Sequence, residues 1–183
     1  MTANLTDLTG TWTIDNTHSR LGFVTRHAMV TKVRGSFNDF QGTVTVPSEG
    51  VEGASAEVTI TASSIDTRNA DRDGHLKSND FFDMETYPEI TFRSTKISAN
   101  GSGGVDVTGD LTIKGQTRSI TVPFDYEGTA TDPFGNLRAG FEGTTVINRS
   151  DFGLTWNAAL ETGGVLVSEK VTLEIEVSAI KEA

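Results

Sequence analysis

The chain of 183 residues contains no cysteine. This absence excludes a disulfide framework, a thiol nucleophile and any metal site that needs thiolate ligands. Basic residues are also few, with 15 lysines and arginines against 25 carboxylates and a formal net charge of −10. Nucleic acids and anionic membrane surfaces both bind clustered cations, so this charge balance argues against either as a partner.

Long apolar runs are missing as well. No stretch approaches the ~20 consecutive apolar residues of a membrane-spanning helix, so we expect no stable membrane insertion. Residues 1–10 lack the basic and apolar segments of a secretory signal and are predicted to form a polar tail. We therefore expect a cytoplasmic protein, periplasmic or secreted only if a signal was removed, with one domain at residues 11–183.

Apolar and polar residues alternate with a period of two along most of the chain. The clearest case is a predicted hairpin, in which residues 105–113 and 120–126 keep their apolar side chains on one face around a turn at Lys114 and Gly115. About eight such strands follow one another at hairpin spacing. This pattern predicts an all-β protein, either an antiparallel up-and-down barrel or a sandwich.

The alternation stops between residues 68 and 92. Charged residues are dense there, no β-branched residue occurs before Phe81 and Phe82, and Pro88 ends any helix near Tyr87. We predict a short helix around residues 69–82 that closes or packs across the barrel interior. Its carboxylates are interpreted as helix caps and solvated ion pairs rather than as an acid–base pair: Asp71, Asp73, Asp80, Asp83 and Glu85.

Residues suited to catalysis or metal binding form no recognisable motif. The three histidines, His18, His27 and His75, lack the close spacing of zinc ligands. No Gly-x-Ser-x-Gly nucleophile elbow and no glycine-rich phosphate loop occurs. We predict no catalytic residues, no metal site and no required cofactor.

Five segments combine aromatic, glycine and charged residues in one order along the chain. They lie at residues 12–23, 33–37, 75–94, 109–117 and 148–154, and the most specific reads His75-Leu76-Lys77-Ser78-x-Asp80-Phe81-Phe82-Asp83. Together these segments resemble the YceI-like family of polyisoprenoid-binding proteins. The resemblance implies an extended antiparallel lipocalin-like barrel of about eight strands with a short helix. It also implies a bound polyisoprenoid, such as a quinone tail or a prenyl lipid, a homodimer, and no catalytic machinery.

A polyprenyl chain offers little but apolar surface, whose burial contributes roughly 25 cal/mol per Å². Apolar side chains therefore suffice to line the pocket, and polar groups are needed only at its mouth. We predict these lining or closing residues: Phe23, Phe37, Val44, Phe81, Phe82, Phe92, Leu111, Ile113, Phe124, Phe141 and Trp156. His27 and Arg149 are predicted to make polar contacts near the mouth.

Two other functions stay open from the sequence. The first is an enzyme that acts on an apolar substrate in the same cavity, using His27 or Asp80. The second is a structural or partner-binding β domain whose core is filled, because a barrel of about eight strands can be packed as well as hollow. Ligand transport and ligand storage are equally compatible with the pattern.

Overall fold

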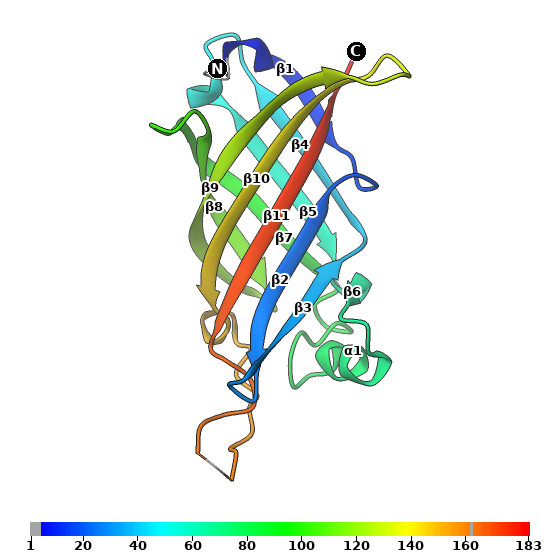
Figure 1. The fold of residues 1–183 in the computed structure, drawn as a ribbon, viewed down its shortest axis with the longest axis vertical. Helices are drawn as coiled ribbons and strands as arrows, with labels where there is room; N and C mark the ends of the chain where they lie inside the picture. Colours follow the sequence, from blue (N-terminus) through cyan, green and yellow to red (C-terminus); the bar gives the residue numbers. More distant parts are fainter. Residues whose placement is uncertain (1–4, 162) are drawn as a thin grey trace.

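The computed structural model describes residues 5–161 and 163–183 as an elongated antiparallel β-barrel with one short helix at one end (Figure 1). The pairing of β1 with β11 closes a ring of eight strands and confirms the predicted fold class. In ring order these are β1 (Gly10–Ile14), β4 (Phe40–Val46), β5 (Ser55–Thr61), β7 (Glu89–Ala99), β8 (Val105–Ile113), β9 (Gln116–Thr131), β10 (Leu137–Asn148) and β11 (Lys170–Lys181).

Three further strands extend the sheet at one end of the ring. They are β2 (Arg20–His27), β3 (Thr31–Phe37) and β6 (Ile65–Asp66). Strand β11 pairs with β1 through Ala179 and with β2 through Leu173, so β1 and β2 lie end to end along the same neighbour. Because β3 pairs with β6 only at Ser36 and Phe37, the rest of that side is left for other elements to cover.

Helix α1 (Ala70–Lys77) lies beside this incomplete side of the barrel (Figure 1). It begins at Asn69, whose side chain accepts a hydrogen bond from the Arg72 backbone N–H at 3.0 Å. It ends five residues earlier than the predicted 82, because both the backbone N–H and the hydroxyl of Ser78 donate to the His75 carbonyl. Phe81 and Phe82 therefore lie in the turns after the helix.

Four 3-10 helices complete the fold: η1 (Leu5–Leu8), η2 (Val51–Gly53), η3 (Ala62–Ser64) and η4 (Arg149–Phe152). Helix η1 falls within the predicted polar tail, and residues 1–4 of that tail lie outside the described residues. Leu8 is only 3% exposed, and its carbonyl accepts a hydrogen bond from Trp12 Nε1 at 2.8 Å. A buried indole N–H requires a hydrogen-bond acceptor, and the bond to the Leu8 carbonyl holds this segment against the barrel.

Two hydrophobic clusters plug the barrel near its two ends. One contains Leu8, Trp12 and Val51 and lies at the end that holds both termini. The other contains Phe81, Met84 and Phe152 and lies at the end beside α1, called the helix end below. No helix among residues 5–161 and 163–183 has the length and apolar character that crossing a membrane would need.

An ionic cluster fastens the end of the barrel that holds the termini. Arg138 Nη1 lies 2.7 Å from Asp15 Oδ2, and Arg138 Nε lies 2.8 Å from Asp132 Oδ2. Burial of Asp15 raises its pKa, but hydrogen bonds from Arg138, Thr17 and His18 outweigh that effect and hold the pKa well below its usual range. The bond from Arg138 and backbone N–H bonds likewise lower the pKa of Asp132.

We expect Arg138→Gln to reduce the dependence of stability on acidic pH. A depressed carboxylate pKa contributes stability above the pKa of the unfolded chain, which is lost as the pH falls through the folded value. The variant and the parent should therefore differ most near neutral pH, and the difference should shrink progressively as the pH falls below about 4 in urea-unfolding series. The control is Arg93→Gln, because Arg93 is exposed and lies 4.0 Å from Glu57. Parallel curves for the Arg138 variant and the parent would contradict this role.

Candidate binding cavity

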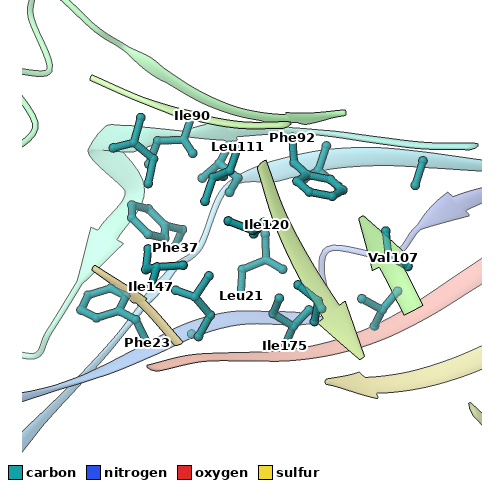
Figure 2. Close-up of a pocket in the computed structure, with 18 of the residues that line it drawn as sticks. Leu21, Phe23, Phe37, Ile90, Phe92, Val107, Leu111, Ile120, Ile147 and Ile175 are labelled. Atoms are coloured by element: carbon teal, nitrogen blue, oxygen red, sulfur yellow. The ribbon is translucent and has the colours of Figure 1, made fainter. Parts of the chain in front are cut away.

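A cavity of about 320 Å³ runs through the barrel between the two plugs. Of the 37 residues that line it, 34 are Ala, Val, Leu, Ile or Phe, and the other three are Gly22, Thr25 and Arg149. Figure 2 shows side chains from neighbouring strands pointing into this space, among them Leu21, Ile120 and Ile175. The volume falls at the lower end of the range of small-molecule pockets, about 300–1,000 Å³.

The lining follows directly from the alternation of the strands. In β11 the residues Val171, Leu173, Ile175 and Val177 all line the cavity, whereas the intervening threonine and glutamates do not. Successive side chains of a strand point to opposite faces, so a closed sheet places one half of each strand inside. The sequence period of two is therefore what makes the interior hydrocarbon.

Glycines make room for the large rings inside the barrel. Gly35 is the cross-strand partner of Phe23, and Gly143 is the partner of Phe124. A Cβ added at either glycine would come within 3 Å of the paired phenylalanine ring. The aromatic side chains thus lie over backbone that has no side chain of its own, which lets a narrow barrel hold several phenylalanines and still keep a cavity.

Eleven of the thirteen predicted site residues line this one cavity. They are Phe23, Phe37, Val44, Phe81, Phe82, Phe92, Leu111, Ile113, Phe124, Phe141 and Arg149. The structure brings them together from seven strands and from the segments after α1 and β10. Their contact with a ligand stays a prediction.

The remaining two predicted residues lie outside the cavity lining. Trp156 packs against the outer side of the plug, with its ring centroid 5.4 Å from Phe81 and 4.7 Å from His75. His27 is exposed at the end of β2, where its backbone bridges to Val167. Alternation could not place them, because Trp156 lies in an irregular loop and His27 lies beyond the end of the cavity.

The segment after α1 closes the cavity at the helix end. Leu76, Phe81 and Phe82 line it from this side, and the Phe82 ring meets the Phe37 ring edge-on at 6.0 Å between centroids. His75 packs edge-on against Phe81, and Asp80 Oδ2 accepts a hydrogen bond from its Nε2 at 2.9 Å, near the surface. The apolar members of this segment therefore face the cavity, and its charges face solvent.

Arg149 is the one charged residue among the cavity-lining residues, and it is 4% exposed. Its guanidinium donates to four backbone carbonyls, at 2.6 Å to Leu154, 2.9 Å to Trp156, 2.9 Å to Ser168 and 3.3 Å to Val167. Burial lowers the pKa of Arg149, and nearby Glu169 partly opposes this. Its donors thus hold residues 154–156 and 167–168 together across the barrel end.

Other polar groups offer the cavity little chemistry. The Thr25 hydroxyl shares a 2.8 Å hydrogen bond with the Ser168 hydroxyl. Within the part of the chain that the structure describes, no group of three or more histidine and carboxylate side chains could hold a metal ion. The arrangement can therefore bury hydrocarbon, and no described side chain in the lining is placed to act on a reacting group.

Many lining residues were not singled out from the sequence. Leu21, Ile120, Ile147, Leu173 and Ile175 all line the cavity alongside the predicted aromatics. Each sits on the apolar face of an alternating strand, so the period of two in the sequence identifies it as facing the interior. The prediction favoured phenylalanines, whereas aliphatic residues from every side in fact contribute.

Comparisons with known proteins agree with this architecture. The sequence profile of the YceI-like domain matches residues 12–179. The UPF0312 protein SA2479 of Staphylococcus aureus (strain N315) is 40% identical over 164 residues, covering 89% of this chain and 93% of that protein. The crystal structure of Burkholderia cenocepacia BcnA matches with a TM-score of 0.78 at 27% identity, covering 90% of this chain and 98% of that one. A polyisoprenoid binding domain from Saccharophagus degradans matches with a TM-score of 0.69 at 18% identity, over 93% of this chain and 98% of that one, so the two proteins share a fold.

Proposed function

Because the chain belongs to the YceI-like family, we propose that it binds a polyisoprenoid lipid inside the barrel and carries or stores it. The ligand class is an isoprenoid quinone tail or a prenyl lipid. The polyisoprenoid binding domain from Saccharophagus degradans, which has the same fold, supports this ligand class. The protein acts by binding, without a cofactor of its own.

The observation that carries the proposal is the composition of the cavity wall. Among the described residues that line it, only Thr25 and Arg149 have polar side chains, and both are already hydrogen-bonded to the protein. A ligand inside the barrel therefore gains free energy almost entirely from buried apolar surface, at roughly 25 cal/mol per Å². A long, slender hydrocarbon chain fits that requirement better than a polar metabolite does.

The two alternatives fit the cavity less well. An enzyme with an apolar substrate needs polar groups in contact with it, but His27 and Asp80 are both exposed and lie outside the lining. A domain with a filled core needs no continuous internal space, whereas this barrel keeps about 320 Å³ between its plugs. Binding is therefore the function that the geometry favours.

The direct test is the lipid content of the purified protein. We expect an organic extract of the natively purified chain, read by mass spectrometry, to contain a prenyl lipid or quinone at a defined ratio to protein. After delipidation the chain should take up added quinone or prenyl alcohol. An empty extract together with no uptake of either compound would refute the proposal.

A tryptophan placed in the cavity should separate a binding cavity from a packed core. We expect Ile175→Trp to reduce lipid retention several-fold while changing the free energy of unfolding by less than about 1 kcal/mol, because the ring enters existing space. In a filled core the same change costs about 1–3 kcal/mol through overpacking. Glu176→Trp, on the outer face of the same strand, is the matched control and should alter neither quantity.

Assembly and location follow from the family resemblance and the sequence. We expect a homodimer, seen by light scattering as twice the 19.6 kDa mass of the chain. We expect a cytoplasmic location, which fractionation of the native host with antibodies against this chain tests. A monomer, or recovery outside the cytoplasm, would correct these two points and leave the binding proposal standing.

A further inference from the structure

An apolar tip protrudes from the helix end of the barrel. It consists of Met29 and Val30, in the turn between β2 and β3, and Val165 on the adjacent loop (Figure 1). Their exposed fractions are 59%, 74% and 41%. They are half of the six large hydrophobic residues that are exposed in the described part of the chain. Large apolar side chains gathered at one protrusion indicate an interaction surface, whereas single scattered ones do not.

The tip is held by backbone contacts. The Ala28 N–H donates to the Leu166 carbonyl at 2.7 Å, and His27 bridges to Val167, so the hairpin and the loop form one unit. Ala28 and Met29 have positive φ angles of 50° and 66°, which are unusual for residues other than glycine. The fold thus fixes two apolar side chains in solvent instead of turning them inward.

The cations around the tip lack carboxylate partners, whereas cations farther along the same strands have one. Arg20 and Arg34 both lie within 4 Å of Glu174, whose one carboxylate balances one of their two charges. Among the described residues, Arg26, Lys32 and Lys170 have no carboxylate within 4 Å.

These three unpaired cations share the outer face of the sheet. Arg26 and Lys32 are cross-strand partners, and Lys170 follows the same outward alternation on β11. Two exposed carboxylates lie on the neighbouring loop, Glu161 and Glu169, and Glu169 accepts a hydrogen bond from the Ser150 backbone N–H at 3.1 Å. Three cations against two carboxylates leave the immediate surroundings of the tip with a net positive charge, in a chain whose formal net charge is −10.

We propose that the apolar tip docks on an anionic lipid bilayer. Met29, Val30 and Val165 enter the interface, and Arg26, Lys32 and Lys170 contact the lipid head groups. The net charge of −10 is a sum over the whole chain, so it does not exclude a local surface that attracts an anionic membrane. The cations beside the tip attract such a surface within the Debye length of about 8–10 Å.

The shape and position of the tip favour a bilayer over a folded protein as its partner. The tip is a convex protrusion, whereas a protein partner would require a matching pocket. It also continues the cavity lining, because Phe23 and Thr25 line the cavity on β2 and Val167 lines it from the loop. If a lipid passes between the membrane and the cavity at this end, that step depends on the proposed function. Docking of the tip on the membrane does not depend on it.

The test is flotation of the delipidated full chain with vesicles. We expect binding to an equal mixture of phosphatidylcholine and phosphatidylglycerol, much weaker binding to phosphatidylcholine alone, and a decline with added salt. The double variant Met29→Ser/Val30→Ser should weaken binding about ten-fold or more. Phe134→Ser is the matched control, since Phe134 is 89% exposed at the opposite end of the barrel and should have no effect.

A second pair of variants tests the charges. Arg26→Gln/Lys32→Gln should lose about five-fold in affinity per cation, and Lys96→Gln/Lys181→Gln, on strands away from the tip, should lose little. Equal loss in both pairs, no difference between the tip variant and Phe134→Ser, or no vesicle binding at all would overturn the proposal and leave the tip to a protein partner. The native lipid extract and the uptake assay separate the two hypotheses: vesicle binding by a chain whose native extract is empty, and which takes up neither quinone nor prenyl alcohol, refutes the proposed function alone.

Discussion

Replacing Arg149 with methionine is expected to lower the free energy of unfolding by about 3–5 kcal/mol. The change removes the desolvation cost of the guanidinium, but it leaves the carbonyls of Leu154, Trp156 and Ser168 without their donor, whereas the Val167 carbonyl keeps a hydrogen bond from Asn157 Nδ2 at 2.8 Å. Each buried carbonyl left unpaired costs about 1–3 kcal/mol, partly recovered where the loop opens to water. Urea unfolding followed by tryptophan fluorescence measures the difference, because Trp156 lies in the loop that is released.

Two variants sharpen this test. Arg149→Lys should recover only part of the loss, because an ammonium has three donors and lacks the planar fork that reaches four carbonyls. Arg118→Met is the matched control, since Arg118 is exposed and donates only to the neighbouring Thr117 carbonyl at 2.8 Å. If Arg149→Met retained full stability but lost its lipid, the guanidinium would act on the ligand and not on the loop.

Arg149 also illustrates what the sequence could predict. Its place in the motif at residues 148–154 predicted a functional position near the cavity end, and the structure places it in the cavity lining. The predicted role was a polar contact at the mouth. The structure commits its donors to backbone carbonyls from two segments up to 19 residues away, a tertiary arrangement that no local pattern encodes.

The barrel itself was predictable because alternation is a local property. Each strand shows its buried face in its own residues, and hairpin spacing gives the antiparallel order. What alternation could not reveal is where strands break, since β1 and β2 share β11 as a neighbour and are separated only by residues 15–19. Register between distant strands, and with it the gap that α1 covers, depends on packing of the whole barrel.

The same limit applies to the stretch from residue 68 to 92. Its loss of alternation correctly predicted a helix set into the sheet, and its pair of phenylalanines predicted closure of the interior. The end of the helix was misplaced, because the Ser78 hydroxyl competes for the His75 carbonyl and stops the helix at Lys77. That early stop lets consecutive phenylalanines point into the cavity, which a continuing helix would not allow, since it turns successive side chains about 100° apart.

The double variant Phe81→Ala/Phe82→Ala is expected to release the lipid much faster than the parent does. Phe81 is 6% exposed and plugs the helix end, and Phe82 packs on Phe37, so truncation removes the closing wall. Loss of a buried phenylalanine also costs about 3–5 kcal/mol of stability. The readout is therefore transfer of a fluorescent prenyl lipid to acceptor vesicles, measured well below the melting temperature of every variant.

The charges of the same segment provide the matched control. Asp80→Asn/Asp83→Asn keeps both phenylalanines and removes the exposed carboxylate that accepts a hydrogen bond from His75, a contact that contributes less than about 1 kcal/mol. Asparagine also tolerates the positive φ of 48° at residue 83. We expect lipid release from this variant at the rate of the parent, and Phe82→Leu should retain most of the closure. If neutralising the carboxylates released lipid faster than removing the rings, the segment would act through its charges, and a polar function at this end of the barrel would replace hydrophobic closure as its role.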